Sequence, residues 1–333
     1  MNSDTTTVDP LDLPICTTCG TQFSTPTPPS PCPICDDPRQ YLPPTGQDYT
    51  TLRALRAPTH EPPLKNILAP LNPNSTTNTS NKIYTLHTTP KHCIGQRAFL
   101  LLTPRGNILW DCIPYLDTDT ISSINALGGI SAIIISHPHY YATHLVWAEA
   151  FNCPVYLSGE DREWVMRVDT SSNTNIADGS KDKGNGGSVN ARQIFWDGQE
   201  VEVLPGSGVI GVKTGGHFPG SSVLWWKDEK VLFLADTIGT IPSGVGDYGD
   251  RGRREGTASY TFMWSYPNMI PLPPDDVHGI WKALKHTEFD RAYGAFMGMD
   301  TVGDCKKRVL DSAKIFVRAM GYLDHAIHEE ECA

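Results

Sequence analysis

The sequence predicts an α/β domain that follows a small cysteine-rich module. Short apolar runs separated by helical segments continue from residue 82 toward the C-terminus, as in layered strand-and-helix folds. One of these runs ends in two histidines spaced i, i+2, and two Cys-x-x-Cys pairs precede residue 45. These three observations predict a metal-binding module over residues 1–45, a connecting arm over 46–81 and the α/β domain over 82–333.

Composition and charge narrow the function classes. The chain has 333 residues and a formal net charge of −10, which argues against a general nucleic-acid binder. It contains no apolar run long enough to span a bilayer, and its N-terminal sequence lacks the basic start and apolar core of a secretory signal. We therefore expect a cytoplasmic protein with no membrane or nucleic-acid partner, whose nine cysteines are reduced and available as metal ligands.

The first four cysteines have the spacing of a four-thiolate metal site. Twelve residues separate Cys16-x-x-Cys19 from Cys32-x-x-Cys35, and Gly20 permits the tight turn that such a knuckle needs. The Thr- and Pro-rich sequence between the pairs cannot build a core without an ion, so we expect a structural Zn²⁺ ribbon. The same cysteine pattern resembles the rubredoxin-like module of rubrerythrins, which implies Fe(Cys)₄ and electron transfer as the alternative.

The rest of the chain reads as strands alternating with helices. Polar sequence rich in Pro, Thr and Asn predicts a surface arm over 46–81, and the Gly-rich stretch 171–188 predicts a mobile insertion. The expected strands are residues 82–86, 98–102, 107–111, 131–135, 154–157, 193–196, 200–204, 209–213, 222–226, 231–234 and 291–298. The expected helices are residues 121–127, 143–151, 159–168, 275–286 and 304–330.

The histidine pair after the apolar run 131–135 is the strongest signal of a functional site. In an extended segment the side chains of His137 and His139 leave the backbone on the same side, so both imidazoles can reach one point. Pro138 stiffens the link between them. A buried strand that ends in such a pair and leads into a helix is a suitable seat for a metal ion.

This stretch resembles the metal-binding turn of the metallo-β-lactamase fold superfamily, whose motif reads His-x-His-x-Asp-His after an apolar strand. His137 and His139 match the first two histidines, whereas Tyr141 and Ala142 stand where the superfamily has its Asp and last His. The resemblance implies a four-layer αβ/βα sandwich that covers more than two-thirds of the chain. Because the two replaced positions hold the second metal in the superfamily, it also implies a degenerate site with one ion.

Two later turns resemble the superfamily's remaining ligands to the first metal. A Gly/His turn supplies the third ligand in the superfamily, and His217 lies in the matching sequence Thr-Gly-Gly-His-Phe-Pro-Gly. Asp236 directly follows the apolar run 231–235, where the superfamily has an Asp. The resemblance therefore implies one Zn²⁺, or alternatively Fe, held by His137, His139, His217 and Asp236. Together with the ribbon, these turns also resemble uncharacterised fungal and bacterial members of the superfamily, and we expect the fungal type.

The resemblance implies a mononuclear metallohydrolase that acts on a small molecule. We expect metal-activated water to hydrolyse an ester, thioester, lactone or amide, with Asp236 as a ligand or as the base. The candidate proton donors are Tyr140, Tyr141 and His144. The long connection 241–274 is a possible lid, and its candidate substrate-binding residues are Tyr260, Trp264 and Tyr266.

Two other functions are compatible with the sequence. Persulfide dioxygenases share the fold and use one iron with two His and one Asp, which resembles the ligand set expected here. An Fe(Cys)₄ ribbon would favour this iron oxidoreductase. The other possibility is a non-catalytic sandwich with a structural metal, whose ribbon binds a partner. Metal analysis separates the three, because iron with visible absorption, two zinc ions with esterase turnover, and an inert sealed metal are different outcomes.

Overall fold

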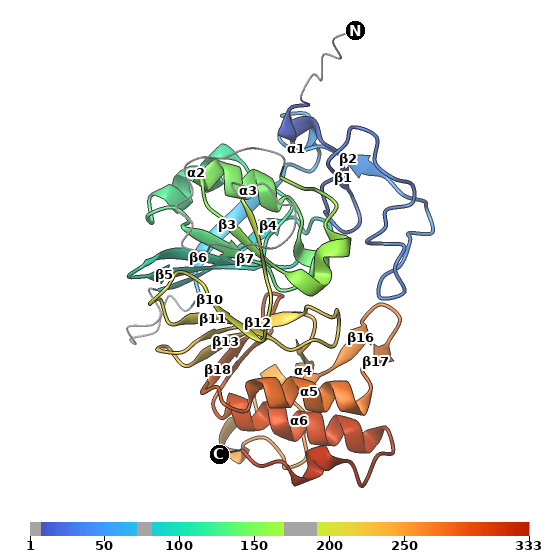
Figure 1. Ribbon diagram of the computed structural model, residues 1–333, viewed down its shortest axis with the longest axis vertical. Coiled ribbons are helices and arrows are strands. Elements are labelled where there is room, and N and C mark those ends of the chain that lie inside the picture. The colour runs from blue at the N-terminus through green and yellow to red at the C-terminus, as the bar shows by residue number, and fades with distance from the viewer. Residues whose placement is uncertain (1–7, 72–81, 170–191, 333) are drawn as a thin grey trace.

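The computed structural model describes residues 8–71, 82–169 and 192–332. The insertion expected at 171–188 lies outside these residues. Within them the chain forms two large β-sheets that face each other, with helices on both outer surfaces (Figure 1). This arrangement confirms the four-layer αβ/βα sandwich that the sequence predicts.

The first sheet has seven strands in the order β3-β4-β5-β6-β7-β8-β9. Its strands are β3 Lys65–Pro70, β4 Ile83–Thr89, β5 Ala98–Thr103, β6 Gly106–Trp110, β7 Ala132–Ile134, β8 Val155–Ser158 and β9 Gln193–Trp196. Pairing is antiparallel from β3 to β6 and parallel from β6 to β9. Because parallel neighbours need a crossover, helix α2 (Thr118–Asn125) joins β6 to β7 and helix α3 (His144–Phe151) joins β7 to β8.

The second sheet has six strands in the order β10-β11-β12-β13-β18-β19. Its strands are β10 Glu200–Glu202, β11 Val209–Lys213, β12 Ser222–Trp226, β13 Val231–Phe233, β18 Arg291–Tyr293 and β19 Asp300–Val302. Helices α5 (Pro274–Leu284) and α6 (Cys305–Ala319) cover its outer face (Figure 1). Their buried apolar residues, Trp281 and Val309 among them, form a core with Leu232 of β13.

The larger core lies between the two sheets. Phe99 of β5 packs against Phe233 of β13 with the ring centroids 5.0 Å apart, and Tyr293 of β18 completes the cluster. Burial of these and the other apolar side chains on both facing surfaces holds the sheets together.

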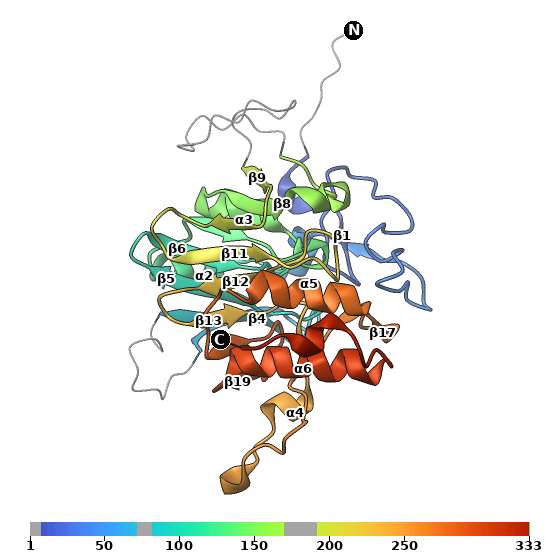
Figure 2. The same ribbon diagram turned by 60° about the horizontal axis from the view of Figure 1, so that its bottom comes forward.

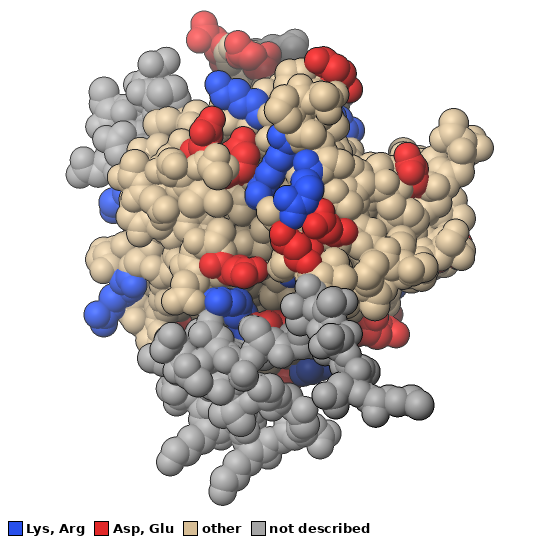
Figure 3. Space-filling model, turned by 90° about the horizontal axis from the view of Figure 1, so that it is seen from above, with Lys and Arg blue, Asp and Glu red and all other residues tan. Residues whose placement is uncertain are grey.

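The N-terminal segment carries the small elements that precede the sandwich. A 3-10 helix (Pro10–Asp12), strands β1 (Ile15–Cys16) and β2 (Tyr49–Thr50) and helix α1 (Leu52–Leu55) pack beside the end of the first sheet (Figure 1). Charges of both signs lie next to one another on the face seen in Figure 3, rather than in one continuous patch. None of the helices in the described part of the chain has the length and apolar composition that a bilayer crossing requires.

The predicted boundary between arm and domain at residue 82 needs correction. The expected arm over 46–81 contributes β3, which pairs with β4 from Lys65↔Thr89 to Pro70↔Tyr84 and starts the first sheet. The sequence of β3 is difficult to recognise as a strand because an edge strand buries little of its surface and ends at a proline. The α/β domain therefore begins before residue 82.

The connection 241–274, expected as a lid, divides into two parts. Its first part, around α4 (Pro242–Val245) and the 3-10 helix Gly249–Arg251, projects away from the sandwich (Figure 2). Its second part returns as β15 (Tyr260–Thr261), β16 (Met263–Ser265) and β17 (Ile270–Pro271). β15 pairs with β14 (Gly239–Thr240), so this second part lies beside the turn that follows β13.

Candidate metal centre

The histidine pair sits at the end of β7, in a turn rather than in an extended segment. His137 has extended backbone angles, φ −168° and ψ 168°, and Pro138 then begins a 3-10 helix that contains His139. The rings still converge, with centroids 5.2 Å apart, but they present different nitrogens, Nε2 of His137 and Nδ1 of His139. The predicted convergence therefore exists, although the expected i, i+2 extended geometry does not produce it.

The other two donors come from the second sheet. Gly215 and Gly216 adopt φ of +63° and +87° after β11, and they turn the chain so that His217 faces the histidine pair. A Cβ on Gly216 would lie 2.9 Å from Leu272 Cδ1, so the turn requires glycine for space as well as for backbone angle. Asp236 follows β13, three residues after Phe233.

Four donor atoms meet at one point between the sheets. Asp236 Oδ2 lies 3.4 Å from His137 Nε2, 4.0 Å from His139 Nδ1 and 3.8 Å from His217 Nε2. His139 Nδ1 and His217 Nε2 are 3.1 Å apart. Bonds of about 2.0–2.1 Å around a tetrahedral Zn²⁺ place neighbouring donors about 3.3–3.4 Å apart, so the residues present fit a metal ion.

Burial keeps these groups in the protonation states that bind metal. Burial lowers the pKa of His139 to about 4 and that of His217 well below its ordinary value, so both imidazoles are neutral at pH 7. Burial alone would raise the pKa of Asp236, but the three imidazoles facing it outweigh burial and hold that pKa well below its usual range. His137 Nε2 is buried and has no hydrogen-bond partner, as expected of an atom whose natural partner is a cation.

Neighbouring groups orient two of the imidazoles through their other nitrogens. His137 Nδ1 lies 2.8 Å from Ser136 Oγ, and His217 Nδ1 lies 3.3 Å from the Met263 carbonyl oxygen. A donated N–H at Nδ1 leaves the lone pair at Nε2 free to face the metal position.

The four cysteines form a second group of metal-binding residues. Their sulfurs converge in a buried cluster, with Cys16 Sγ 3.7 Å from Cys35 Sγ and Cys19 Sγ 3.8 Å from Cys32 Sγ. Zn–S bonds of about 2.3 Å in a tetrahedron place sulfurs about 3.8 Å apart, so these residues also fit an ion. Gln47 Nε2 donates to Cys16 Sγ at 3.0 Å, which is a typical stabilising contact of a thiolate ligand.

Comparison with known proteins decides the family. The sequence pattern described as "Metallo-beta-lactamase superfamily" matches residues 94–286, which is more than half of the chain. The chain belongs to the metallo-β-lactamase superfamily. It is also 38% identical over 286 residues to the uncharacterized protein YmaE of Bacillus subtilis (strain 168), covering 85% of this chain and 88% of that relative.

Solved structures of the superfamily's fold resemble this chain at low sequence identity. The metallo-β-lactamase DIM-1 has a TM-score of 0.47 at 11% identity and covers 77% of this chain and 98% of its own. FIM-1 from Pseudomonas aeruginosa, in its mono-zinc form, has a TM-score of 0.45 at 11% identity, with 76% and 96% covered. The chemotaxis sensor ODP, described as a peroxy diiron species, has a TM-score of 0.44 at 12% identity, with 77% and 99% covered.

The two positions that hold a second metal in the superfamily carry no side-chain donor that belongs to the four-residue cluster of this chain. Tyr141 is buried and its hydroxyl has no hydrogen-bond partner, while Ala142 has only a methyl group as its side chain. Ala142 adopts φ +43°, and its carbonyl oxygen accepts a hydrogen bond from Gln22 N at 3.1 Å. Tyr140 instead reaches the centre, since its hydroxyl donates to Asp236 Oδ1 at 2.5 Å.

Two expected site residues lie elsewhere. His144, expected as a proton donor, has Nδ1 2.9 Å from the Tyr141 carbonyl oxygen and Nε2 2.7 Å from Gln193 Nε2, so it holds α3 against β9. Tyr260, expected to bind substrate, is buried in the core under α6, with its hydroxyl 2.6 Å from Thr301 Oγ1. In both cases the helix or strand that carries the residue directs its side chain into the core. The sequence pattern alone does not show this direction.

A cavity of about 350 Å³, the metal cavity, opens beside Asp236. Tyr266 lines the cavity, with its ring 6.2 Å from that of His217, whereas Trp264 is not one of the lining residues and lies against the Arg39 guanidinium. Its walls are mostly apolar, with Lys91 at one side. The wall residues that the sequence reasoning missed include Thr18, Gln40, Tyr41, Lys91, Phe296 and Met299.

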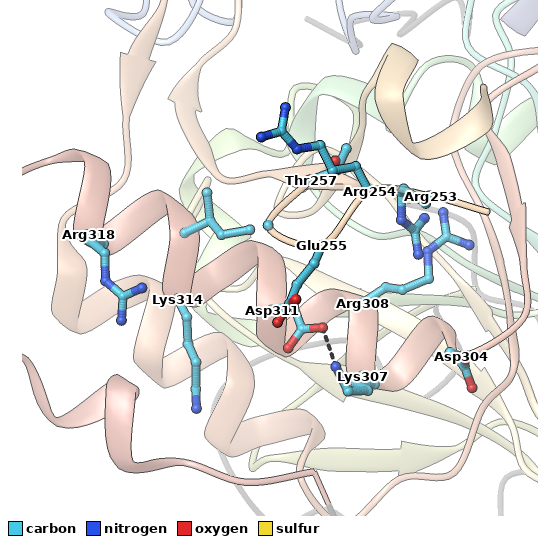
Figure 4. A pocket seen from close by; sticks show the side chains of 12 residues that line it. Arg253, Arg254, Glu255, Thr257, Asp304, Lys307, Arg308, Asp311, Lys314 and Arg318 are labelled. Atoms are coloured by element: carbon cyan, nitrogen blue, oxygen red, sulfur yellow. Dashed lines mark hydrogen bonds and ion pairs between the residues drawn. The ribbon is translucent and has the colours of Figure 1, made fainter. Parts of the chain in front are cut away.

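A larger cavity lies away from the metal centre and contains none of its ligands. It measures about 510 Å³ and lies between α6 and the segment 253–257 (Figure 4). Several of its cations already have partners within the chain: Lys307 Nζ pairs with Asp311 Oδ2 at 2.6 Å, and Arg308 Nη2 donates to Gly244 O at 2.6 Å. The metal cavity is therefore the better candidate for the functional site.

Proposed function

We propose that the protein is a metal-dependent hydrolase with one metal ion in its His/Asp centre, and that its substrate is a small ester, thioester, lactone or amide. One observation carries this proposal: four donors, three of them on buried histidines and one on the partly buried Asp236, lie within 4.8 Å of one another and adjoin the metal cavity of about 350 Å³. A bound Zn²⁺ supplies an acidified water and polarises a carbonyl group.

The residues of the chain perform the remaining tasks. His137, His139 and His217 present imidazole nitrogens toward one point, those of His139 and His217 neutral, and Asp236 adds one negative charge there. Burial, together with the charge of Asp236, raises the pKa of Tyr140 well above its ordinary value, so its hydroxyl keeps its proton. Tyr140 thereby holds one carboxylate oxygen and leaves Asp236 Oδ2 toward the imidazoles.

The proposal of one ion rests on two features. Tyr141 and Ala142 replace the superfamily's ligands to the second metal. The Tyr140 hydroxyl occupies Asp236 Oδ1, the oxygen that would otherwise be free to bridge to another ion. Both features favour a single metal with a cavity on one side of it.

The apolar walls of the metal cavity favour a substrate with a hydrocarbon group beside its carbonyl. Ile94, Ile238 and Met299 line the cavity, and Lys91 adds one exposed ammonium at its side. Displacement of water from such walls stabilises an apolar group, while the cation attracts a negatively charged end.

The test is hydrolysis by the zinc-loaded full chain of a panel of short-chain aryl esters, acyl thioesters, lactones and amides. We expect turnover of at least one class, and its loss in Asp236→Asn and His137→Ala. The matched control is His286→Ala, which removes a half-exposed histidine that pairs with Glu200 and belongs to neither group of metal-binding residues, and it should leave turnover unchanged. Absence of turnover with zinc, together with oxygen consumption by the iron-loaded chain on a persulfide, would replace hydrolysis with iron oxidoreductase chemistry.

A further inference from the structure

The chain that follows the Cys₄ cluster runs directly into the metal centre. Residues 36–41 leave Cys35 and lie against the segment 263–268 of the sandwich. Asn268 Nδ2 donates to the carbonyl oxygens of Pro38 at 3.1 Å and Gln40 at 3.0 Å. Ser265 Oγ donates to the Arg39 carbonyl oxygen at 2.9 Å. Three hydrogen bonds thus fix the backbone of this loop on the domain that carries the metal ligands.

Arg39 binds this loop to the turn that carries His217. Its Nε donates to the carbonyl oxygen of His217 at 2.7 Å, and its guanidinium lies 4.4 Å from the ring centroid of Phe218. Asp37 accepts two hydrogen bonds from Arg39 Nη1, at 3.0 and 2.9 Å, and orients the guanidinium. Since the Arg39 side chain is only 14% exposed, these contacts are largely shielded from water, unlike those of a surface ion pair.

The next residue, Gln40, reaches the ligand atoms. Its Nε2 lies 3.3 Å from His139 Nδ1, the nitrogen that is 3.1 Å from His217 Nε2 and faces Asp236. Gln40 also lines the metal cavity together with Asp236. A half-turn of its amide exchanges the N–H donors for a carbonyl acceptor, so the side chain can offer either to a molecule in the cavity.

We propose that Gln40 is a substrate-binding residue of the metal centre, delivered to it by the Cys₄ module. Its amide closes the cavity side of the four-ligand centre and hydrogen-bonds the polar group that a ligand places beside the metal. The four cysteines and Arg39 are the residues that position Gln40. The identity of the ligand's polar group as a scissile carbonyl rests on the proposed function, whereas the place of Gln40 beside the metal does not.

Two binding measurements on the zinc-loaded full chain test this assignment. The first is the zinc dissociation constant of the His/Asp centre by chelator competition, and the second is the affinity for acetohydroxamate, a small metal-directed carbonyl compound. Gln40→Ala should weaken acetohydroxamate about tenfold, the value of one hydrogen bond of ~1.4 kcal/mol, and change zinc affinity little. Gln40→Glu should tighten zinc about tenfold, because it places a negative charge beside the cation.

Leu42→Ala is the matched control, since this exposed residue lies in the same stretch of chain and does not line the cavity. It should change zinc affinity less than Gln40→Glu and acetohydroxamate affinity less than Gln40→Ala. Wild-type affinities for both probes in Gln40→Ala and Gln40→Glu would overturn the proposal. Because both readouts are binding constants, a protein that hydrolyses nothing in the substrate panel would refute the proposed function and leave this test intact.

The role of the module is tested by Cys35→Ser, which should remove the Cys₄ metal and weaken acetohydroxamate as much as Gln40→Ala does. Arg39→Met provides the same test in a chain that keeps all four cysteines, and should weaken acetohydroxamate several-fold at full zinc content. Unchanged acetohydroxamate affinity in a folded, zinc-loaded Arg39→Met would show that the module does not position Gln40.

Discussion

The hydroxyl of Tyr140 donates a 2.5 Å hydrogen bond to Asp236 Oδ1, while the other carboxylate oxygen, Oδ2, pairs with the three imidazoles. This contact fixes which oxygen of Asp236 is available to a metal ion. It also joins the turn after β7 to the turn after β13, so it ties the two sheets together at the centre.

Tyr140→Phe should therefore weaken metal binding. Loss of a hydrogen bond to a ligating carboxylate typically costs about 10–100-fold in metal affinity, and we expect that range here. Chelator competition measures the change, and circular dichroism checks that the fold is retained. Tyr141→Phe is the control, because the Tyr141 hydroxyl is buried without a partner and its removal should leave affinity unchanged. Equal affinities in wild type and Tyr140→Phe would mean that Asp236 keeps its orientation without this bond.

The metal content of the chain should be two ions, one in each group of ligands. His217→Ala should retain only the ion of the Cys₄ cluster, and Cys32→Ser only the ion of the His/Asp centre. Elemental analysis of chains purified with excess zinc measures these numbers, and His286→Ala should still hold two. A third equivalent that disappears in His217→Ala would show that the centre is dinuclear, despite Tyr141 and Ala142.

Gly216→Ala should destabilise the fold and weaken metal binding together. The residue has φ +87°, and its added Cβ would lie 2.9 Å from Leu272 Cδ1 and 3.1 Å from Thr237 Oγ1. A left-handed backbone angle costs a non-glycine residue about 1–2 kcal/mol, and the contact with Leu272 adds to this. Chemical denaturation measures the loss of unfolding free energy, and chelator competition measures the displacement of His217.

Gly198→Ala separates the two contributions to that loss. Gly198 has a similar φ of +84°, but its added Cβ would meet nothing within 4 Å. Gly198→Ala should lose only the unfolding free energy that the left-handed backbone angle costs, and its metal affinity should stay unchanged. If Gly216→Ala is no worse than Gly198→Ala, the turn before His217 has room to adjust.

Glu330 should contribute a stability that acid removes. Hydrogen bonds from Lys285 and His278 lower the pKa of Glu330 to about 2, and its carboxylate thereby pins the C-terminal segment to α5. Because the folded-state pKa is below the unfolded value of 4.5, the contribution is complete above pH 4.5 and disappears as the pH falls toward 2. Glu330→Gln should lower the unfolding free energy by about 1–2 kcal/mol at pH 7.

Denaturation of wild type and Glu330→Gln at a series of pH values measures this effect, since both proteins have the same metal ligands at each pH. The difference between them should shrink below pH 4.5. A difference that stays constant down to pH 3 would assign the loss to packing rather than to the charge.

The sandwich and the ligand residues of its centre were predictable because both follow from local sequence. Apolar runs mark the strands, and His137, His217 and Asp236 each come directly after such a run or after the turn that ends it. The two Cys-x-x-Cys pairs are equally local, since each is a short knuckle with fixed spacing. The metallo-β-lactamase motif then connects these scattered residues to one another.

The parts that sequence reasoning missed depend on contacts between distant segments. β3 buries little surface of its own and is recognisable only by its pairing with β4. Tyr260 lies in an aromatic segment that suggested a pocket wall, yet its ring packs under α6. Gln40 stands in a polar, Pro-rich stretch with no periodicity, and only the docking of residues 36–41 brings it to His139.

The sequence by itself determined the layered α/β fold, the two sets of metal-binding residues and the replacement of the second-metal ligands, because each is encoded by residue type and short-range spacing. The tertiary structure alone decided which nitrogens face the metal position, that Tyr140 and not His144 supports the centre, and that the Cys₄ module forms a wall of its cavity. The physical reason is that these properties depend on the relative placement of the two sheets and the module. That placement is set by long-range packing and buried hydrogen bonds between residues as far apart as Arg39 and His217.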